Sequence, residues 1–192
     1  MKTLSERIRF LPASDDPLSA DVFFIEGEKR TYVYDVGSCE AALQALHAQE
    51  KPLVVVLSHF HQDHTGNIKQ LPVDELYVGS LTEKKIEMGT VVRDVVTIDD
   101  GVHLEIRHCP SPHANGSLIL TVDNTYTLVG DLYYTRPGQV DRGLAMHMLS
   151  VLKTVDTKYI VTSHEDEKVH EKDALLRELR AFFNSEKGNQ KN

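Results

Sequence analysis

A continuous aliphatic run at Leu53–Leu57 leads almost directly into a segment that is crowded with histidine. Aliphatic residues fill every position of the run instead of every second one, which is typical of a strand buried on both faces in a sheet covered by helices. This pattern favours an α/β fold, in which sheets and helices form layers around a shared core. The histidine-rich segment therefore begins where a buried strand ends.

The segment that follows this strand reads Ser-His-Phe-His-Gln-Asp-His over residues 58–64, so that His59, His61, Asp63 and His64 lie within six positions. Neutral imidazole and carboxylate are good ligands for zinc and similar divalent ions. Without a cation, several of them on one short loop would repel or desolvate one another. A solvated surface loop is the alternative, whereas an expression tag is excluded by the internal position and the interrupting Asp63. The segment predicts a metal site.

The length and composition fit one compact domain. Of the 192 residues, 41% are hydrophobic, so we expect a single domain over residues 1–192 that ends in a polar tail at 186–192. The formal net charge is −8. Nucleic acid is an unfavourable partner for such a chain, because phosphate backbones are bound by clustered Lys and Arg.

The sequence also predicts the compartment. Residues 1–10 are rich in charge and hold no secretory apolar segment, and no stretch approaches the ~20 apolar residues that span a membrane. Cys39 and Cys109 are too few for a disulfide framework and fit a reducing environment as plain thiols. We therefore expect a cytoplasmic protein without a membrane partner.

The rest of the chain alternates between strand and helix patterns. The expected strands are 22–26 and 31–36 as a hairpin, 53–57, 75–78, an antiparallel set at 95–98, 102–107, 117–122 and 126–129, and 159–162. The expected helices are 40–49, a short one that ends before Pro72, 82–88, 143–154 and 173–184. This order predicts two packed sheets with helices outside.

Three more ligand-type residues follow expected strands. His113 lies in a loop fixed by prolines and glycine, and Asp131 and His164 each come directly after an apolar run. Each alone is weak, since a single histidine is more often a surface or core residue. Their shared placement at strand ends, where side chains can meet in one cleft, makes them candidates together. The acidic run Glu165–Glu167 is predicted to be a solvated face.

At this point the chain resembles the metallo-β-lactamase-fold hydrolases, including glyoxalase II-like and lactonase-like members, over nearly its whole length. His59–His64 matches the signature of that superfamily, and Ser111–Ser117 looks like its Gly-His-Thr-Pro-Gly-Ser loop. Gly130–Asp131 and Ser163–His164 match its two later ligand positions, and Tyr34–Gly37 is similar to its first motif. Pro112, Ala114 and Glu165 depart from the usual residues, which affects local loop shape and not ligation.

The resemblance implies a four-layer αββα sandwich of two mixed β-sheets with outer helices. It also implies two divalent ions, with Zn²⁺ expected first and Mn²⁺ or Fe²⁺ as alternatives. One ion would be held by His59, His61 and His113, and the other by Asp63, His64 and His164, with Asp131 as a bridge. Asp35 would orient a ligating imidazole, as outer carboxylates commonly do, or would simply cap the turn after its strand.

The expected chemistry is hydrolysis. Two metal ions lower the pKa of a shared water and polarise a carbonyl or phosphoryl oxygen, and Asp63 can hold the resulting hydroxide and accept or return its proton. A ligand set with Asp131 and histidines resembles the ligand sets of the thioesterase and lactonase branches and differs from that of true β-lactamases. Tyr134 stands three residues after Asp131, as a tyrosine does in the lactonase branch, where it would bind the substrate carbonyl. Simple aromatic packing is the alternative for Tyr134.

The sequence therefore predicts a binuclear-metal hydrolase that uses a bridging hydroxide on an ester, thioester or lactone of a small metabolite. A phosphodiesterase with the same metals is the first alternative, for which Arg136 and Arg142 are the candidate phosphate-binding residues. A mononuclear iron oxygenase of the same fold is the second, although His61 stands where the di-iron branch has glutamate. A metal-stabilised binding module without turnover is the third, and seven ligand-type residues argue against it. The pattern gives neither the substrate nor the oligomeric state.

Overall fold

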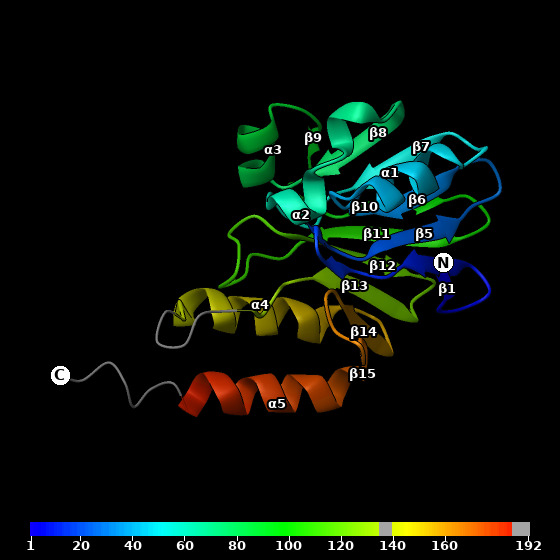
Figure 1. Ribbon diagram of the computed structural model, residues 1–192. Coiled ribbons are helices and arrows are strands. Elements are labelled where there is room, and N and C mark those ends of the chain that lie inside the picture. Colours follow the sequence, from blue (N-terminus) through cyan, green and yellow to red (C-terminus); the bar gives the residue numbers. More distant parts are fainter. Residues whose placement is uncertain (135–139, 186–192) are drawn as a thin grey trace.

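Two β-sheets form the centre of the computed structural model, which describes residues 1–134 and 140–185 (Figure 1). Among these residues, the first sheet has the strand order β1 (Lys2–Thr3), β2 (Ile8–Leu11), β5 (Val22–Glu26), β6 (Thr31–Tyr34), β7 (Leu53–Val56), β8 (Val73–Val78) and β9 (Thr90–Val91). The second has the order β10 (Val96–Asp99), β11 (His103–His108), β12 (Leu118–Val122), β13 (Tyr126–Gly130), β14 (Tyr159–Thr162) and β15 (Val169–Glu171). A short hairpin pairs β3 (Ser14–Asp15) with β4 (Leu18–Ser19).

Both sheets are mixed. In the first sheet β6, β7, β8 and β9 run parallel, whereas β1, β2 and β5 add antiparallel pairs. In the second sheet the pairs from β10 to β13 are antiparallel, as the sequence predicts, and β13 pairs with β14 in parallel. The carboxyl ends of the parallel strands are the positions at which α/β proteins place their ligand-binding loops.

The main core lies between the two sheets. Successive residues of a strand face opposite sides, so Phe23 and Ile25 of β5 point into this core while Val22 and Phe24 point outward to the helices. All four residues of β7 are buried, which confirms the strand with two covered faces that the run at Leu53–Leu57 predicts. Each large apolar side chain buried in this way stabilises the fold by about 1.5–3 kcal/mol.

Helices cover the outer faces. The helical segments are α1 (Glu40–His47), a 3₁₀ turn at Ile68–Gln70, α3 (Ser80–Ile86), α4 (Arg142–Thr154) and α5 (Lys172–Ser185), and the short helix α2 (Gln62–Thr65) lies in the histidine-rich segment. Ala42 and Leu46 of α1 pack on the first sheet, and Met148 of α4 and Leu179 of α5 pack on the second. Figure 1 shows α4 and α5 together on the side of the molecule opposite α1. The four-layer α/β sandwich with two mixed sheets is confirmed.

Six short strands were not predicted, namely β1, β2, β3, β4, β9 and β15. Most have two or three residues, which is too short for a periodic pattern. β1, β2, β9 and β15 form along the edge of a neighbouring strand, whereas β3 and β4 pair with each other. The predicted hairpin strand at 31–36 ends at Tyr34, because Asp35 turns the chain with a φ of 57°. The polar tail at 186–192 lies outside the described residues.

Two further sequence expectations concern the thiols and the membrane. Cys39 and Cys109 are both free, and burial raises the pKa of the Cys109 thiol to about 12, so that it stays protonated. None of the helices in the described part of the chain combines the length and apolar character needed to cross a bilayer.

Candidate metal centre

The seven ligand-type residues come from loops that follow four strands and from one short helix. His59 and His61 follow β7, and Asp63 and His64 lie in the short helix α2 that comes next. The other three residues follow strands of the second sheet, with His113 after β11, Asp131 after β13 and His164 after β14. The fold therefore brings strand ends of both sheets together, and all seven residues fall into two groups that could each hold a metal ion.

The first group consists of three imidazoles. His59 Nε2 lies 2.9 Å from His61 Nδ1, and His113 Nε2 lies 3.2 Å from the former and 3.1 Å from the latter. Four ligands placed tetrahedrally at about 2.0–2.1 Å from zinc are about 3.3 Å apart, so this spacing suits three ligands of one ion. The third ligand comes from the second sheet and the first two from the first sheet.

The second group consists of Asp63, His64, Asp131 and His164. Asp63 Oδ2 lies 3.0 Å from His164 Nε2 and 3.4 Å from His64 Nε2. Asp131 Oδ2 lies 3.3 Å from His64 Nε2. Two carboxylates and two imidazoles are a donor set that suits zinc and other first-row divalent ions.

Three buried polar atoms of the second group lack a hydrogen-bond partner among the described residues, namely His64 Nε2, Asp131 Oδ1 and His164 Nε2. His164 Nε2 is close to Asp63, but not in hydrogen-bond geometry. Leaving a buried polar atom unpaired costs about 1–3 kcal/mol. A divalent cation among these atoms would satisfy all three, and the residues present therefore fit a metal.

Asp131 stands between the two groups. Its Oδ2 lies 3.3 Å from His64 Nε2 of the second group and 3.7 Å from His113 Nε2 of the first. Gly130 permits this approach, because it has a φ of 58° and a Cβ there would lie 2.8 Å from Ser58 Oγ. One carboxylate facing both groups is the placement that a bridging ligand needs.

Outer partners fix three of the imidazoles. Asp35 Oδ2 lies 2.8 Å from His64 Nδ1, and Ser58 Oγ lies 2.9 Å from His59 Nδ1. His113 Nδ1 donates to the carbonyl of Tyr134 at 2.7 Å. Such contacts leave Nε2 of each ring free to face the metal position.

Asp35 does more than cap a turn. Its carboxylate is 1% exposed and also accepts the backbone N–H of Ser58 at 2.7 Å, so it links the turn after β6 to the start of the histidine loop. The sequence allows two interpretations of Asp35, a carboxylate that orients an imidazole or a residue that only caps a turn. The structure favours the first, with His64 as the imidazole. Asp35 and His164 both have left-handed backbones, with φ values of 57° and 62°. Such strain in residues other than glycine concentrates at functional sites.

The two groups differ in the protonation states that their surroundings favour. Burial lowers the pKa of His59 and of His61, and the neighbouring imidazoles lower both further, so these rings stay neutral with free lone pairs. Burial would also lower the pKa of His64, but Asp35 and the other carboxylates around it raise it well above its usual value. Burial opposes ionisation of Asp63, yet His164 and His64 hold the pKa of its carboxyl well below its usual range.

Asp21 is a buried residue of the site that the sequence analysis missed. It is 0% exposed and accepts the backbone N–H of His164 at 2.9 Å as well as the ammonium group of Lys168. It also exchanges hydrogen bonds with Ser163. Asp21 therefore holds the turn that carries His164. The only signal for Asp21 in the sequence is that a charged residue stands directly before the apolar strand Val22–Glu26.

We expect Asp21→Asn to destabilise the protein, because it leaves the buried Lys168 ammonium without its counter-charge. Breaking a buried ion pair from one side costs about 3–5 kcal/mol, which lowers the melting temperature of a chain of this size by roughly 10 °C. Thermal unfolding followed by circular dichroism measures the change. The double variant Asp21→Asn/Lys168→Met is the control and should recover part of the loss. A single variant that melts like the wild type would contradict this account.

Glu165 corrects the prediction that residues Glu165–Glu167 form a solvated face. Asp166 and Glu167 are exposed, but Glu165 is half-buried. It accepts from Thr162 Oγ1 at 2.6 Å and pairs with His170 Nε2 at 3.1 Å. His170 is therefore also engaged, through a contact that no local pattern indicates.

Three further residues were candidates for contacts with the substrate, namely Tyr134, Arg136 and Arg142. The Tyr134 hydroxyl donates to the carbonyl of Ser163 at 3.1 Å, next to His164. Arg142, a candidate phosphate-binding residue, begins α4 and donates to Asn184 of α5. Arg136, the other one, lies outside the described residues.

Comparison with known proteins supports the same fold. Residues 15–73 match the family model described as the metallo-beta-lactamase superfamily. A metallo-beta-lactamase from Pontibacter korlensis has a TM-score of 0.75 at 14% identity, with 95% of this chain and 97% of that one covered. An archaeal metallo-beta-lactamase superfamily protein from Sulfolobus tokodaii has a TM-score of 0.70 at 19% identity, with 98% and 90% covered. A search of curated proteins gives no match.

A flavodiiron protein from Giardia intestinalis is also similar, with a TM-score of 0.73 at 13% identity. The alignment covers 96% of this chain and 59% of that protein. Proteins described as lactamases and as flavodiiron thus share the architecture, and a fold by itself does not specify a reaction. The reaction has to be argued from the site.

Proposed function

Since the chain has the fold of the metallo-β-lactamase superfamily, we propose that its two side-chain groups hold two divalent ions and that it hydrolyses an ester, thioester or lactone of a small metabolite. One observation carries the proposal. Seven ligand-type side chains from both sheets converge in two adjacent groups, and three of their buried polar atoms lack any partner among the described residues.

The donor sets support zinc as the first choice of metal. The group of His59, His61 and His113 offers nitrogen alone, and the second group offers two nitrogens and two carboxylates. Imidazole suits zinc, iron and copper, whereas Mg²⁺ and Ca²⁺ prefer oxygen. Mn²⁺ and Fe²⁺ remain the alternatives, because both accept mixed nitrogen and oxygen ligands.

The proposed role of each residue in the site follows from its contacts. When bound, two such ions provide a hydroxide nucleophile at neutral pH and polarise the carbonyl that it attacks. Asp63 belongs to the second group, where its Oδ2 lies 3.0 Å from His164 Nε2 and 3.4 Å from His64 Nε2, and there its carboxylate could hold and return a proton. Asp35, Ser58 and the Tyr134 carbonyl keep three imidazoles aimed inward. No serine or cysteine nucleophile is required.

Tyr134 has a proposed catalytic role as well. Its backbone carbonyl already positions His113, while its hydroxyl lies beside the segment that carries His164. We propose that the hydroxyl exchanges the Ser163 carbonyl for the carbonyl of the substrate. The hydroxyl keeps one hydrogen bond in this exchange, but the carbonyl of the buried residue Ser163 loses its donor, which costs about 1–3 kcal/mol unless water replaces it.

The test is a reconstitution assay. Metal-free protein is loaded with Zn²⁺, Mn²⁺ or Fe²⁺ and assayed against matched thioesters, lactones and a bis-aryl phosphodiester, with oxygen uptake followed in parallel. We expect thioester or lactone hydrolysis that chelation abolishes and metal restores. His61→Ala is the control for the site and should lose both metal and turnover. Exclusive phosphodiester cleavage, oxygen consumption with iron or a loaded protein with no turnover would each refute the proposal.

A further inference from the structure

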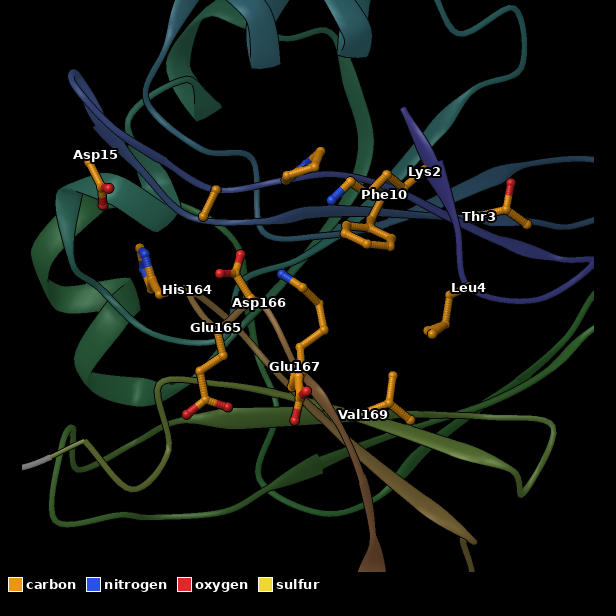
Figure 2. A pocket seen from close by; sticks show the side chains of 13 residues that line it. Lys2, Thr3, Leu4, Phe10, Asp15, His164, Glu165, Asp166, Glu167 and Val169 are labelled. Carbon is orange, nitrogen blue, oxygen red and sulfur yellow. The ribbon is translucent and has the colours of Figure 1, made fainter.

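A cavity of about 520 Å³ opens beside the candidate metal centre, and His164 forms part of its wall. Its other lining residues come from the N-terminal strands, the loop after β2 and the turn between β14 and β15. Figure 2 shows His164 and Asp15 on one side of the view, Leu4, Phe10 and Val169 on the other, and Asp166 between them. The volume falls in the range of about 300–1,000 Å³ that small-molecule sites occupy.

One wall of the cavity is apolar and fixed. Phe10 is 7% exposed, and its ring stacks on Phe23 of the core with centroids 5.5 Å apart. Leu4, Pro12 and Val169 extend this wall. Because the wall includes a ring held by the sheet, it can receive an apolar group without first being ordered.

The polar part of the lining is acidic. It contains the carboxylates of Asp15, Glu165, Asp166 and Glu167. Lys168 also lines the cavity, but Asp21 neutralises its ammonium group, which in addition lies 5.0 Å from the centre of the Phe10 ring. Among the described residues of the lining, Lys2 is the only other lysine or arginine. The lining therefore carries an excess of negative charge.

Three of these carboxylates are available to a ligand. Glu165 is engaged by Thr162 and His170, whereas Asp15, Asp166 and Glu167 are exposed. Within residues 1–134 and 140–185, these three form no ion pair. A cation that enters the cavity could therefore pair with them directly, and partial enclosure strengthens such an attraction relative to open water.

We propose that this cavity binds the ammonium end of the substrate, so that the enzyme acts on esters, thioesters or lactones that carry an amine on an apolar chain. This inference rests on the proposed function, which supplies the bond that is hydrolysed. The cavity supplies the selectivity for an amine. The apolar wall would take the chain, the carboxylates would take the ammonium group, and the shared residue His164 places the cavity next to the metals. A carboxylate in place of the amine would be repelled.

The experiment compares three thioesters of one thiol with the zinc-loaded protein, namely hexanoyl, 6-aminohexanoyl and adipoyl. The amine lies far enough from the carbonyl that the intrinsic reactivities match. We expect kcat/KM for the aminohexanoyl chain to exceed that for the hexanoyl chain by about tenfold and that for the adipoyl chain by more. The preference should shrink at high salt, because exposed charges are screened. Equal rates, or a preference for adipoyl, would overturn the proposal.

Matched variants localise the effect. Asp166→Asn/Glu167→Gln removes two charges from the cavity and should reduce the amine preference to about twofold or less. Asp156→Asn/Glu178→Gln removes the same two charges from exposed positions that do not line the cavity, and it should retain the full preference. If both double variants lose the preference equally, the overall charge and not the cavity is responsible, and the proposal fails.

A binding measurement separates this proposal from the proposed function. Hexylammonium and hexanol are titrated into the zinc-loaded protein, and binding is followed by calorimetry. We expect hexylammonium to bind at least fivefold more tightly, with the advantage lost in Asp166→Asn/Glu167→Gln. If no thioester is hydrolysed but this advantage is found, the hydrolase proposal fails and the cavity proposal stands. Equal affinities would refute the cavity proposal whatever the activity.

Discussion

Asp131→Ala is expected to remove about one of two metal equivalents and to lower kcat by about 10³-fold or more. Its Oδ2 faces His64 of one group and His113 of the other, at 3.3 Å and 3.7 Å from their Nε2 atoms. No other described carboxylate has this position between the two groups. Its loss would remove the carboxylate that faces both groups, and with it the support for the proposed pair of ions and their activation of water. Metal analysis of the purified variant, with kcat on the best substrate, measures both effects.

Asp156→Ala is the matched control for Asp131→Ala, because it removes an exposed aspartate outside the two groups. It should keep two metals and full turnover. Asp131→Asn tests charge alone, since it preserves the size of the side chain and one ligating oxygen. We expect its loss of turnover to lie between those of the wild type and the alanine variant. An Asp131→Ala protein with two metals and unchanged kcat would show that Asp131 is not a bridge.

Metal binding is expected to raise the melting temperature of chelator-treated protein by roughly 5–10 °C. The reason is that the folded chain gathers the ligands, with three imidazole nitrogens 2.9–3.2 Å apart and buried atoms of the second group without partners among the described residues, whereas the unfolded chain does not. A ligand that binds only the folded state at 100 times its Kd stabilises it by about 2.7 kcal/mol, and each kcal/mol shifts the melting temperature of such a chain by about 2–4 °C. Thermal unfolding at increasing concentrations of Zn²⁺ measures the shift.

Magnesium provides the control for this effect, because it prefers oxygen ligands and should not stabilise a site made chiefly of imidazole. His61→Ala should melt close to the wild type without metal, since His61 is only partly buried, but should gain less from Zn²⁺. If zinc, manganese and iron all leave the melting temperature of the wild type unchanged, the two groups do not form a metal centre in solution.

Local patterns were sufficient to predict the site where several ligand-type residues lie close together in the sequence. They were also sufficient to predict a strand that is buried on both faces. The histidine-rich segment at 58–64 and the aliphatic run before it identified one end of the site and the layered fold around it. His113, Asp131 and His164 could be grouped with it because each follows a strand, and strand ends of packed sheets meet in space.

The missed features depend on which side chains and strands meet in the folded chain, and residue types along the sequence do not show this. The partner of Asp21 is Lys168, which is 147 positions away in the sequence. The role of Asp21 therefore depends on a contact that forms only in the folded chain. Glu165 looks like its exposed neighbours in an acidic run, yet Thr162 and His170 turn it inward. β1 and β15 are too short to show a period, and they exist as strands only because β2 and β14 offer them free edges.

Anomalous diffraction at the zinc absorption edge from crystals of the zinc-loaded protein tests the central claim most directly, because it locates each metal without reference to activity. The account predicts two peaks, one among His59, His61 and His113 and the other among Asp63, His64, Asp131 and His164. No peak at these side chains, or zinc found only at surface residues elsewhere, would contradict it.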